Sequence, residues 1–314
     1  MKKVEQIPLS EFFRLIKKPH YVLGTTYTLS LAFFESVVYP EIDRSNLKSC
    51  LILCDRLGYN SALTEGAALQ SAGQDYMVVP APVSGCFHPK VWIVIGDGEA
   101  VLLAGSGNLT QAGFMTNAEF FDALHFNSKT PLSRELLDTV RTFINGLASM
   151  WSPEDSHHLL CVETLSQIEA ALAGLPVAAI TDEISPRFLH SFSGPLIEQM
   201  PADPDARELY IAAPFFGNSL EGLHLFARRY PMAKLNVFPA VHDAKATDIP
   251  LKKVKEFYKG ADISRLSVPL KKGAFAHLKL YGVARDKETA WICCTSANCT
   301  EAADQRTFSS QGVS

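Results

Sequence analysis

The sequence predicts an α/β protein in which one structural unit occurs twice. The order strand, helix, strand, closed by a β-hairpin, is expected in the first half of the chain and again in the second. Each expected hairpin begins with a His-x-Lys tripeptide and is followed by a Ser-x-Asn. The chain has 314 residues, 47% of them hydrophobic and 20% charged, which is enough to build two domains with buried cores.

The first copy is expected to begin with a buried strand at 21–27. Ser30 suits the N-cap of a helix that ends at Pro40, because its hydroxyl can accept a hydrogen bond from the first helical turn. The other elements are apolar runs bounded by turn residues: a strand at 50–54, a helix at 64–72, a strand at 76–79 and hairpin strands at 87–95 and 100–104.

The second copy repeats this order after two connecting helices at 132–150 and 163–173. A shift of 189 positions superposes the two hairpins and places Gly24 on Ala213. We therefore predict a first domain over 1–175 and a second over 176–314. The elements of the second copy are a strand at 209–213, a helix at 219–229, a strand at 235–238, a helix at 251–259 and hairpin strands at 275–284 and 290–294.

Polar residues recur at matched spacing in the two hairpins. The Ser follows the His by 18 residues in the first copy and by 19 in the second. Because side chains alternate along a strand, a His and a Lys two positions apart point to the same side. One His-x-Lys arises easily by chance, but two with matching Ser-x-Asn sequences indicate a site. Its residues are His88, Lys90, Ser106 and Asn108 in the first copy and His277, Lys279, Ser296 and Asn298 in the second.

These residue types can hydrolyse a phosphodiester without a metal ion. One imidazole attacks phosphorus to form a phosphohistidine, and the other protonates the leaving oxygen and then activates water. Lys90 and Lys279 supply positive charge to the phosphate oxygens, and the Asn and Ser side chains supply further hydrogen-bond donors. We predict neither a metal nor a cofactor, because no ligand-spaced His and Cys set and no nucleotide-binding glycine loop is present.

The charge distribution predicts the type of binding partner, and the cysteine content predicts the cellular compartment. The net charge is −4, but residues 250–279 carry eight basic and two acidic side chains, a local excess of six positive charges. This stretch leads into the second His-x-Lys and contains Lys271 and Lys272, which we expect to bind a nucleic-acid substrate. Seven scattered cysteines indicate reduced thiols and a cytoplasmic location, and no apolar run is long enough to insert into a membrane.

The doubled His-x-Lys and Ser-x-Asn pattern resembles the phospholipase D superfamily from Tyr21 to about Thr300. The resemblance implies two α/β sandwich halves, related by a pseudo-twofold axis, with one shared active site. It also implies that His88 is the nucleophile and His277 the general acid and base. Asn117-Ala-Glu119 matches an Asn-x-Glu that follows the first motif in the family, so Glu119 would orient a catalytic imidazole.

The chain also departs from the family pattern. The Asp expected seven residues after each His is replaced by Ile95 and Ala284, which is common in nuclease-like members. No Asn-x-Glu follows Asn298 before the sequence ends at Ser314. Either the second copy lacks its orienting carboxylate or the sequence is a fragment of a longer protein, and we favour the second explanation.

The sequence is therefore interpreted as a metal-independent nuclease acting on DNA or RNA, with a setting in bacterial anti-phage defence or DNA processing and a helicase or other defence subunit as a partner. Two alternatives stay open: a hydrolase or transferase of phospholipid headgroups, and a non-catalytic module that binds nucleic acid. Oligomeric state is left open.

Overall fold

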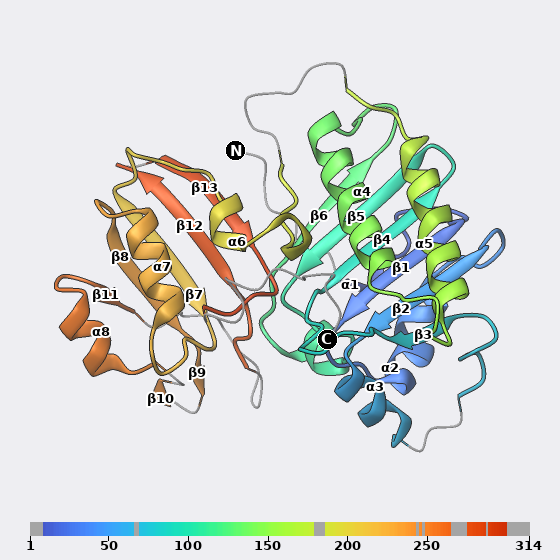
Figure 1. Ribbon diagram of the computed structural model, residues 1–314, viewed down its shortest axis with the longest axis horizontal. Coiled ribbons are helices and arrows are strands. Elements are labelled where there is room, and N and C mark those ends of the chain that lie inside the picture. The colour runs from blue at the N-terminus through green and yellow to red at the C-terminus, as the bar shows by residue number, and fades with distance from the viewer. Residues whose placement is uncertain are drawn as a thin grey trace. The chain divides into compact units, whose positions relative to one another are not determined.

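A computed structural model describes residues 9–65, 69–178, 186–242, 245–246, 249–264, 275–286 and 288–299 (Figure 1). The chain divides into two compact units. The first comprises Met1–Leu103, Asn108–Met115 and Ala123–Phe188, and the second comprises Ala104–Gly107, Thr116–Asp122 and Leu189–Ser314. Each unit contains a β-sheet and helices, so the predicted α/β class is confirmed.

The first sheet has six strands in the order β3-β2-β1-β4-β5-β6. β1 and β2 are parallel, as are β2 and β3, whereas β4 is antiparallel to β1. β6 was not expected from the sequence. The strands are β1 (Tyr21–Thr26), β2 (Ser49–Cys54), β3 (Met77–Pro80), β4 (Val91–Gly96), β5 (Glu99–Gly105) and β6 (Phe121–Phe126).

The second sheet has five strands in the order β11-β8-β7-β12-β13. β7 and β8 are parallel and β12 is antiparallel to β7, as in the corresponding part of the first sheet. This shared order confirms the duplication of one α/β unit. The strands are β7 (Glu208–Ala213), β8 (Lys234–Pro239), β11 (Asp262–Ile263), β12 (Leu280–Arg285) and β13 (Glu288–Cys294), and β9 (Val241–His242) pairs separately with β10 (Lys245–Ala246).

The first unit has helices on both faces of its sheet. In Figure 1, α4 and α5 lie side by side across one face, and Ile93 of β4 lines a small apolar space with residues of both helices. Trp92, the preceding residue, points to the other face, where it stacks on Phe34. The helices are α1 (Leu9–Phe12), α2 (Leu31–Phe33), the π-helix η1 (Phe34–Val38), the 3₁₀ turn η2 (Tyr39–Glu41), α3 (Arg56–Leu63), the π-helix η3 (Ala112–Thr116), α4 (Arg134–Ser149) and α5 (His158–Ala173).

One predicted helix is wrong. The described residues of 64–72 are not helical, and the helix is α3, which ends at Leu63. It starts earlier because Asp55, directly after β2, accepts a hydrogen bond from the amide of Leu57 and caps the first turn. The predicted N-cap of the preceding helix is confirmed, since Ser30 Oγ accepts from the amide of Phe33.

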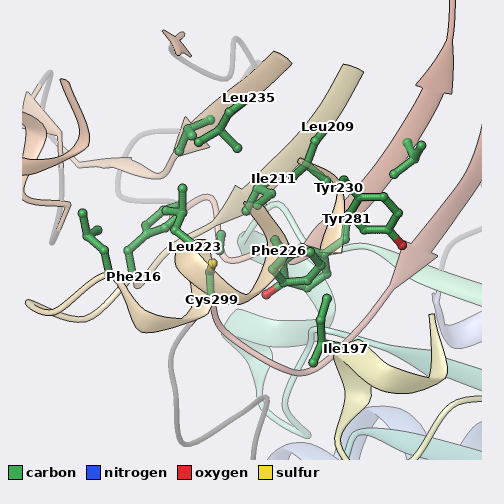
Figure 2. Close-up of a cluster of buried hydrophobic side chains, with 14 of the residues drawn as sticks. Ile197, Leu209, Ile211, Phe216, Leu223, Phe226, Tyr230, Leu235, Tyr281 and Cys299 are labelled. Atoms are coloured by element: carbon green, nitrogen blue, oxygen red, sulfur yellow. The ribbon is translucent and has the colours of Figure 1, made fainter. Parts of the chain in front are cut away.

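The core of the second unit packs on one side of its sheet (Figure 2). Phe226 of α7 (Glu221–Arg229) stacks on Tyr281 of β12 with ring centroids 4.6 Å apart. Burial of such rings, at about 25 cal/mol per Å² of apolar surface, is the main stabilising contribution here. The remaining helices are the 3₁₀ turn η4 (Ser191–Ser193), α6 (Leu196–Gln199) and α8 (Leu251–Phe257).

The register of the ladders corrects the alignment of the two copies. Trp92 and Tyr281 each lie four residues after the motif histidine. Trp92 pairs with Gly24, whereas Tyr281 pairs with Ile211, so Gly24 corresponds to Ile211 and not to Ala213. Gly24 is required at its position because a Cβ there would lie 2.6 Å from the ring of Trp92.

The hairpin strands also begin later than predicted, at Val91 and Leu280 in place of 87 and 275. Both His-x-Lys tripeptides therefore lie in segments without regular secondary structure that precede β4 and β12. Within the described residues, no helix is long and apolar enough to span a membrane.

Candidate active site

In the first unit, His88 lies beside Lys90. The ammonium nitrogen of Lys90 is 3.2 Å from each ring nitrogen of His88 and donates a hydrogen bond to the His88 carbonyl oxygen at 3.1 Å. Lys90 is only 1% exposed. Burying an ammonium group is costly unless polar groups surround it, so this arrangement is not that of an ordinary surface lysine.

Two buried side chains hold the ends of this segment. Asp55 Oδ2 accepts a hydrogen bond from the amide of Phe87 at 2.8 Å, on the amino side of His88. Thr25 Oγ1 accepts one from the amide of Val91 at 2.9 Å, on the carboxyl side of Lys90. Asp55 also caps α3, so one carboxylate fixes both a helix and the approach to His88.

Tyr27, just after β1, packs against the same pair. Its ring centroid is 5.0 Å from that of His88, and Lys90 Nζ lies 5.9 Å from the centroid of the Tyr27 ring. Burial, with a smaller effect from Cys86 and Asp55, raises the pKa of Tyr27, so its hydroxyl is neutral at physiological pH. Neither Tyr27 nor Asp55 was predicted from the sequence to be part of the site.

In the second unit, Glu119 holds His277. Nδ1 of His277 lies 3.0 Å from Oε1 and 3.1 Å from Oε2 of Glu119. The Glu119 side chain is 4% exposed and that of His277 is 16% exposed. A carboxylate at Nδ1 fixes the orientation of the ring and leaves Nε2 facing away from Glu119. Nε2 of His277 lies 2.9 Å from Nζ of Lys279.

Backbone pairing places Glu119 at this distance. Ala118 forms a parallel bridge with Ala276. The Ala118 amide donates to the carbonyl of Phe275 at 2.9 Å, and the His277 amide donates to the carbonyl of Ala118 at 3.0 Å. Asn117 Oδ1 accepts from the amide of Phe275. Asn117 thus anchors the partner segment, in addition to its 3.4 Å contact with Glu119.

Ser106 supports Glu119 from the other side. Its hydroxyl donates to Glu119 Oε2 at 2.6 Å and accepts from the amide of Phe120 at 3.0 Å. Ser106 is fully buried. A Cβ on the preceding residue, Gly105, would collide with the carbonyl oxygen of Phe120, so only glycine permits this approach. Ser106 therefore contacts the carboxylate that orients His277, a different contact from the phosphate predicted for it.

Lys279 is the most deeply buried cation of the second unit among the residues described. It is 0% exposed and donates to the His277 carbonyl oxygen at 2.8 Å. Burial lowers the pKa of Lys279 to about 7, and Glu119 and Cys294 only partly offset this effect. Lys279 can therefore change charge near neutral pH.

The residues of the two Ser-x-Asn sequences differ in their surroundings. Asn108 belongs to the first unit, where its Oδ1 accepts from the amide of Thr28 at 3.4 Å. Ser106, two residues earlier, belongs to the second unit. In the second motif, Ser296 and Asn298 are half-buried, and Asn298 Oδ1 is a buried acceptor without a hydrogen-bond partner in the described part of the chain.

Lys271 and Lys272 lie outside the described residues, so their binding of substrate stays a prediction. Lys252, Lys253 and Lys255 of the same basic stretch lie exposed on α8. Across the described residues, no group of three or more His, Cys, Asp or Glu side chains is placed to hold a metal ion.

No model of a known protein family matches the sequence, and no curated protein matches it. The fold is similar to that of yeast tyrosyl-DNA phosphodiesterase, with 14% sequence identity and a TM-score of 0.55 over 97% of this chain and 84% of that one. A variant of the yeast enzyme matches with 11% identity and a TM-score of 0.56, over 92% of this chain and 81% of that one. These likenesses extend over both units.

Proposed function

We propose that this chain is a phospholipase D-type phosphodiesterase that cleaves nucleic acid through a phosphohistidine and needs no metal ion. The observation that carries the proposal is the same contact in both units, an imidazole held against a buried lysine two residues away. Each His–Lys pair offers a nucleophile or acid together with a positive charge for a phosphate oxygen.

His88 is assigned as the nucleophile. One of its ring nitrogens attacks phosphorus, an N–P bond forms, and the P–O bond to the leaving group breaks. Lys90 and Lys279 stabilise the charge on the non-bridging oxygens, and Asn108 and Asn298 donate from their amides. The proposal therefore requires both histidines to act on one phosphorus centre.

His277 is assigned as the general acid and base. It gives a proton to the leaving oxygen, and Glu119 stabilises the imidazolium needed for this step. In the second step His277 removes a proton from water, the new O–P bond forms, and the N–P bond to His88 breaks. Ser106 keeps the Glu119 carboxylate in position through its 2.6 Å hydrogen bond.

Nucleic acid is the preferred substrate because the basic side chains of α8 suit a phosphate backbone and the similar yeast enzyme is named for DNA. Lys271 and Lys272 are proposed to extend this basic surface. Anti-phage defence, a helicase partner and a cytoplasmic location stay predictions, since no feature of the described residues bears on them.

The test is cleavage of labelled oligonucleotides in the presence of a chelator, followed by trapping of the intermediate. With a p-nitrophenyl phosphodiester, whose leaving group needs no acid, His277→Ala should accumulate a covalent adduct on His88, detected by mass spectrometry. His88→Ala should form none. An adduct on His277 in the His88→Ala protein would reverse the two roles, and no cleavage by the unmodified chain would reject the proposal.

The same set of variants distinguishes two other functions from the proposed one. Release of headgroups from phosphatidylcholine vesicles without cleavage of oligonucleotides would identify a lipid hydrolase. Unchanged nucleic-acid binding in both histidine variants, with no turnover by any protein and binding lost in Lys90→Ala, would identify a non-catalytic module.

A further inference from the structure

An aromatic row extends from His277 to the surface of the second unit. The ring centroids of Phe275 and His277 are 6.0 Å apart, with the planes inclined by 39°. Phe275 and Phe215 follow at 6.4 Å and 41°. Phe215 is 37% exposed, whereas its neighbour Phe216 is fully buried in the core of this unit. The row therefore ends in a ring that is open to solvent.

Backbone pairing holds the middle ring of the row, and the outer ring lies at the end of a strand. Phe275 lies in the segment that pairs with residues 117–118, and its amide and carbonyl are both hydrogen-bonded there. Phe215 lies between β7 and α7, at the carboxyl end of a parallel strand, where α/β sheets commonly bind ligands. In the first unit, Tyr27 follows the corresponding strand β1 and packs against His88 with the ring planes inclined by 40°.

A positive charge contacts the same loop. Lys253 of α8 donates a hydrogen bond from Nζ to the carbonyl oxygen of Asn218 at 2.9 Å, three residues after Phe215. Lys252 and Lys255 lie exposed on the same short helix. An exposed aromatic ring with neighbouring lysines is the arrangement by which proteins bind single-stranded nucleic acid, because bases stack on the ring and phosphates meet the charge.

We propose that Phe215 and Phe275 form a stacking platform for an unpaired nucleobase next to the phosphodiester that His277 acts on. This inference rests on the proposed function, and it assigns single-stranded nucleic acid as the substrate form. Inside a duplex each base is stacked between its neighbours and offers no free face to Phe215, so duplex interiors should bind less well than single strands. Lys253 contacts a phosphate of the nucleic-acid strand whose base stacks on Phe215.

The test is fluorescence anisotropy with a labelled single-stranded oligonucleotide, in full-length proteins that carry His88→Ala to prevent turnover. Phe215→Ala should weaken binding by about 5- to 100-fold, the loss typical of one stacked base, and Phe215→Trp should restore it. An oligonucleotide of equal length with abasic sites should bind Phe215→Ala and the parent equally. Lys253→Gln should weaken binding of both oligonucleotides and reduce the salt dependence.

The matched control is Tyr210→Ala, since Tyr210 of β7 is also 37% exposed and belongs to the same unit. It should leave both affinities unchanged. Equal binding of the normal oligonucleotide by Phe215→Ala and its parent, or an equal loss on the abasic strand, would overturn the platform. Cleavage by the unmodified chain is scored separately. Binding as expected without any cleavage would support the platform and reject the proposed function. Cleavage with no effect of Phe215→Ala on binding would support the proposed function and reject the platform.

Discussion

Glu119 and His277 are 158 positions apart in the chain, and the carboxylate of Glu119 lies 3.0 Å from Nδ1 of His277. Each belongs to a different copy of the duplicated sequence, yet both lie in the second compact unit. The orienting acid that follows the first motif thus serves the histidine of the second.

Glu119→Gln tests this pairing. The amide keeps the size of the side chain but loses the charge that stabilises the imidazolium, so turnover should fall by roughly 10²- to 10⁴-fold. The measurement is kcat on a labelled oligonucleotide. Glu99→Gln is the control because Glu99 also lies 3.0 Å from a histidine, His125, which has no assigned role. Equal kcat for Glu119→Gln and the unmodified protein would show that His277 does not depend on this carboxylate.

Lys279 should give the reaction a pH dependence. Because burial lowers its pKa to about 7, the ammonium form dominates below that pH and the neutral amine above it. If the ammonium binds phosphate, kcat/KM should fall as pH rises through about 7. Lys279→Arg stays charged throughout, so its profile should lack this decline even though its activity is lower. A decline of the same shape in both proteins would assign it to another group.

The buried Lys279 should also lower the free energy of unfolding of the protein. Its folded-state pKa is lowered, so the unfolded chain binds more protons between about pH 7 and 10.5, and stability rises with pH in that window. Lys279→Met should therefore be more stable than the parent by about 1–3 kcal/mol at pH 6, with a smaller difference at pH 9. Urea denaturation measures both values. Lys252→Met, at an exposed position, should show no such trend, and a destabilised Lys279→Met would contradict the prediction.

The two motif asparagines should respond differently to replacement. Asn298 Oδ1 is buried without a hydrogen-bond partner in the described residues, so Asn298→Ala should lower the free energy of unfolding by less than about 0.5 kcal/mol. The same change should lower turnover at least about 10-fold. Asn108→Ala removes an acceptor for the Thr28 amide, so it should lower the free energy of unfolding by about 1 kcal/mol and also lower turnover. Thermal unfolding and kcat distinguish these outcomes. A large stability loss at Asn298 would indicate a structural role for that side chain.

Local sequence patterns, such as apolar runs and residue spacing, predicted part of the fold and of the site. The apolar runs identified most strands, and the two-residue spacing predicted that each lysine lies on the same side as its histidine. The helix at 64–72 was misplaced because apolar periodicity outweighed the capping carboxylate of Asp55, which the structure places at the start of α3. β6, with the sequence FDALHF, begins two residues after Glu119 and was not predicted.

Long-range contacts could not be predicted. The histidine that Glu119 contacts depends on the bridge between Ala118 and Ala276, whose register no local pattern specifies. The contacts of Tyr27 and Phe275 depend on how loops pack after the strands have formed. The contact of Ser106 with Glu119 likewise requires the approach of two segments at Gly105.

The division of the chain between Gly107 and Asn108 has a practical consequence for dissecting the molecule. No single proteolytic cut yields the second unit intact, because a fragment starting at residue 189 would lack Ser106 and Glu119 and leave the His277 imidazole without its carboxylate. Complementation by a peptide that spans 104–122 would be needed to recover that histidine in its native setting.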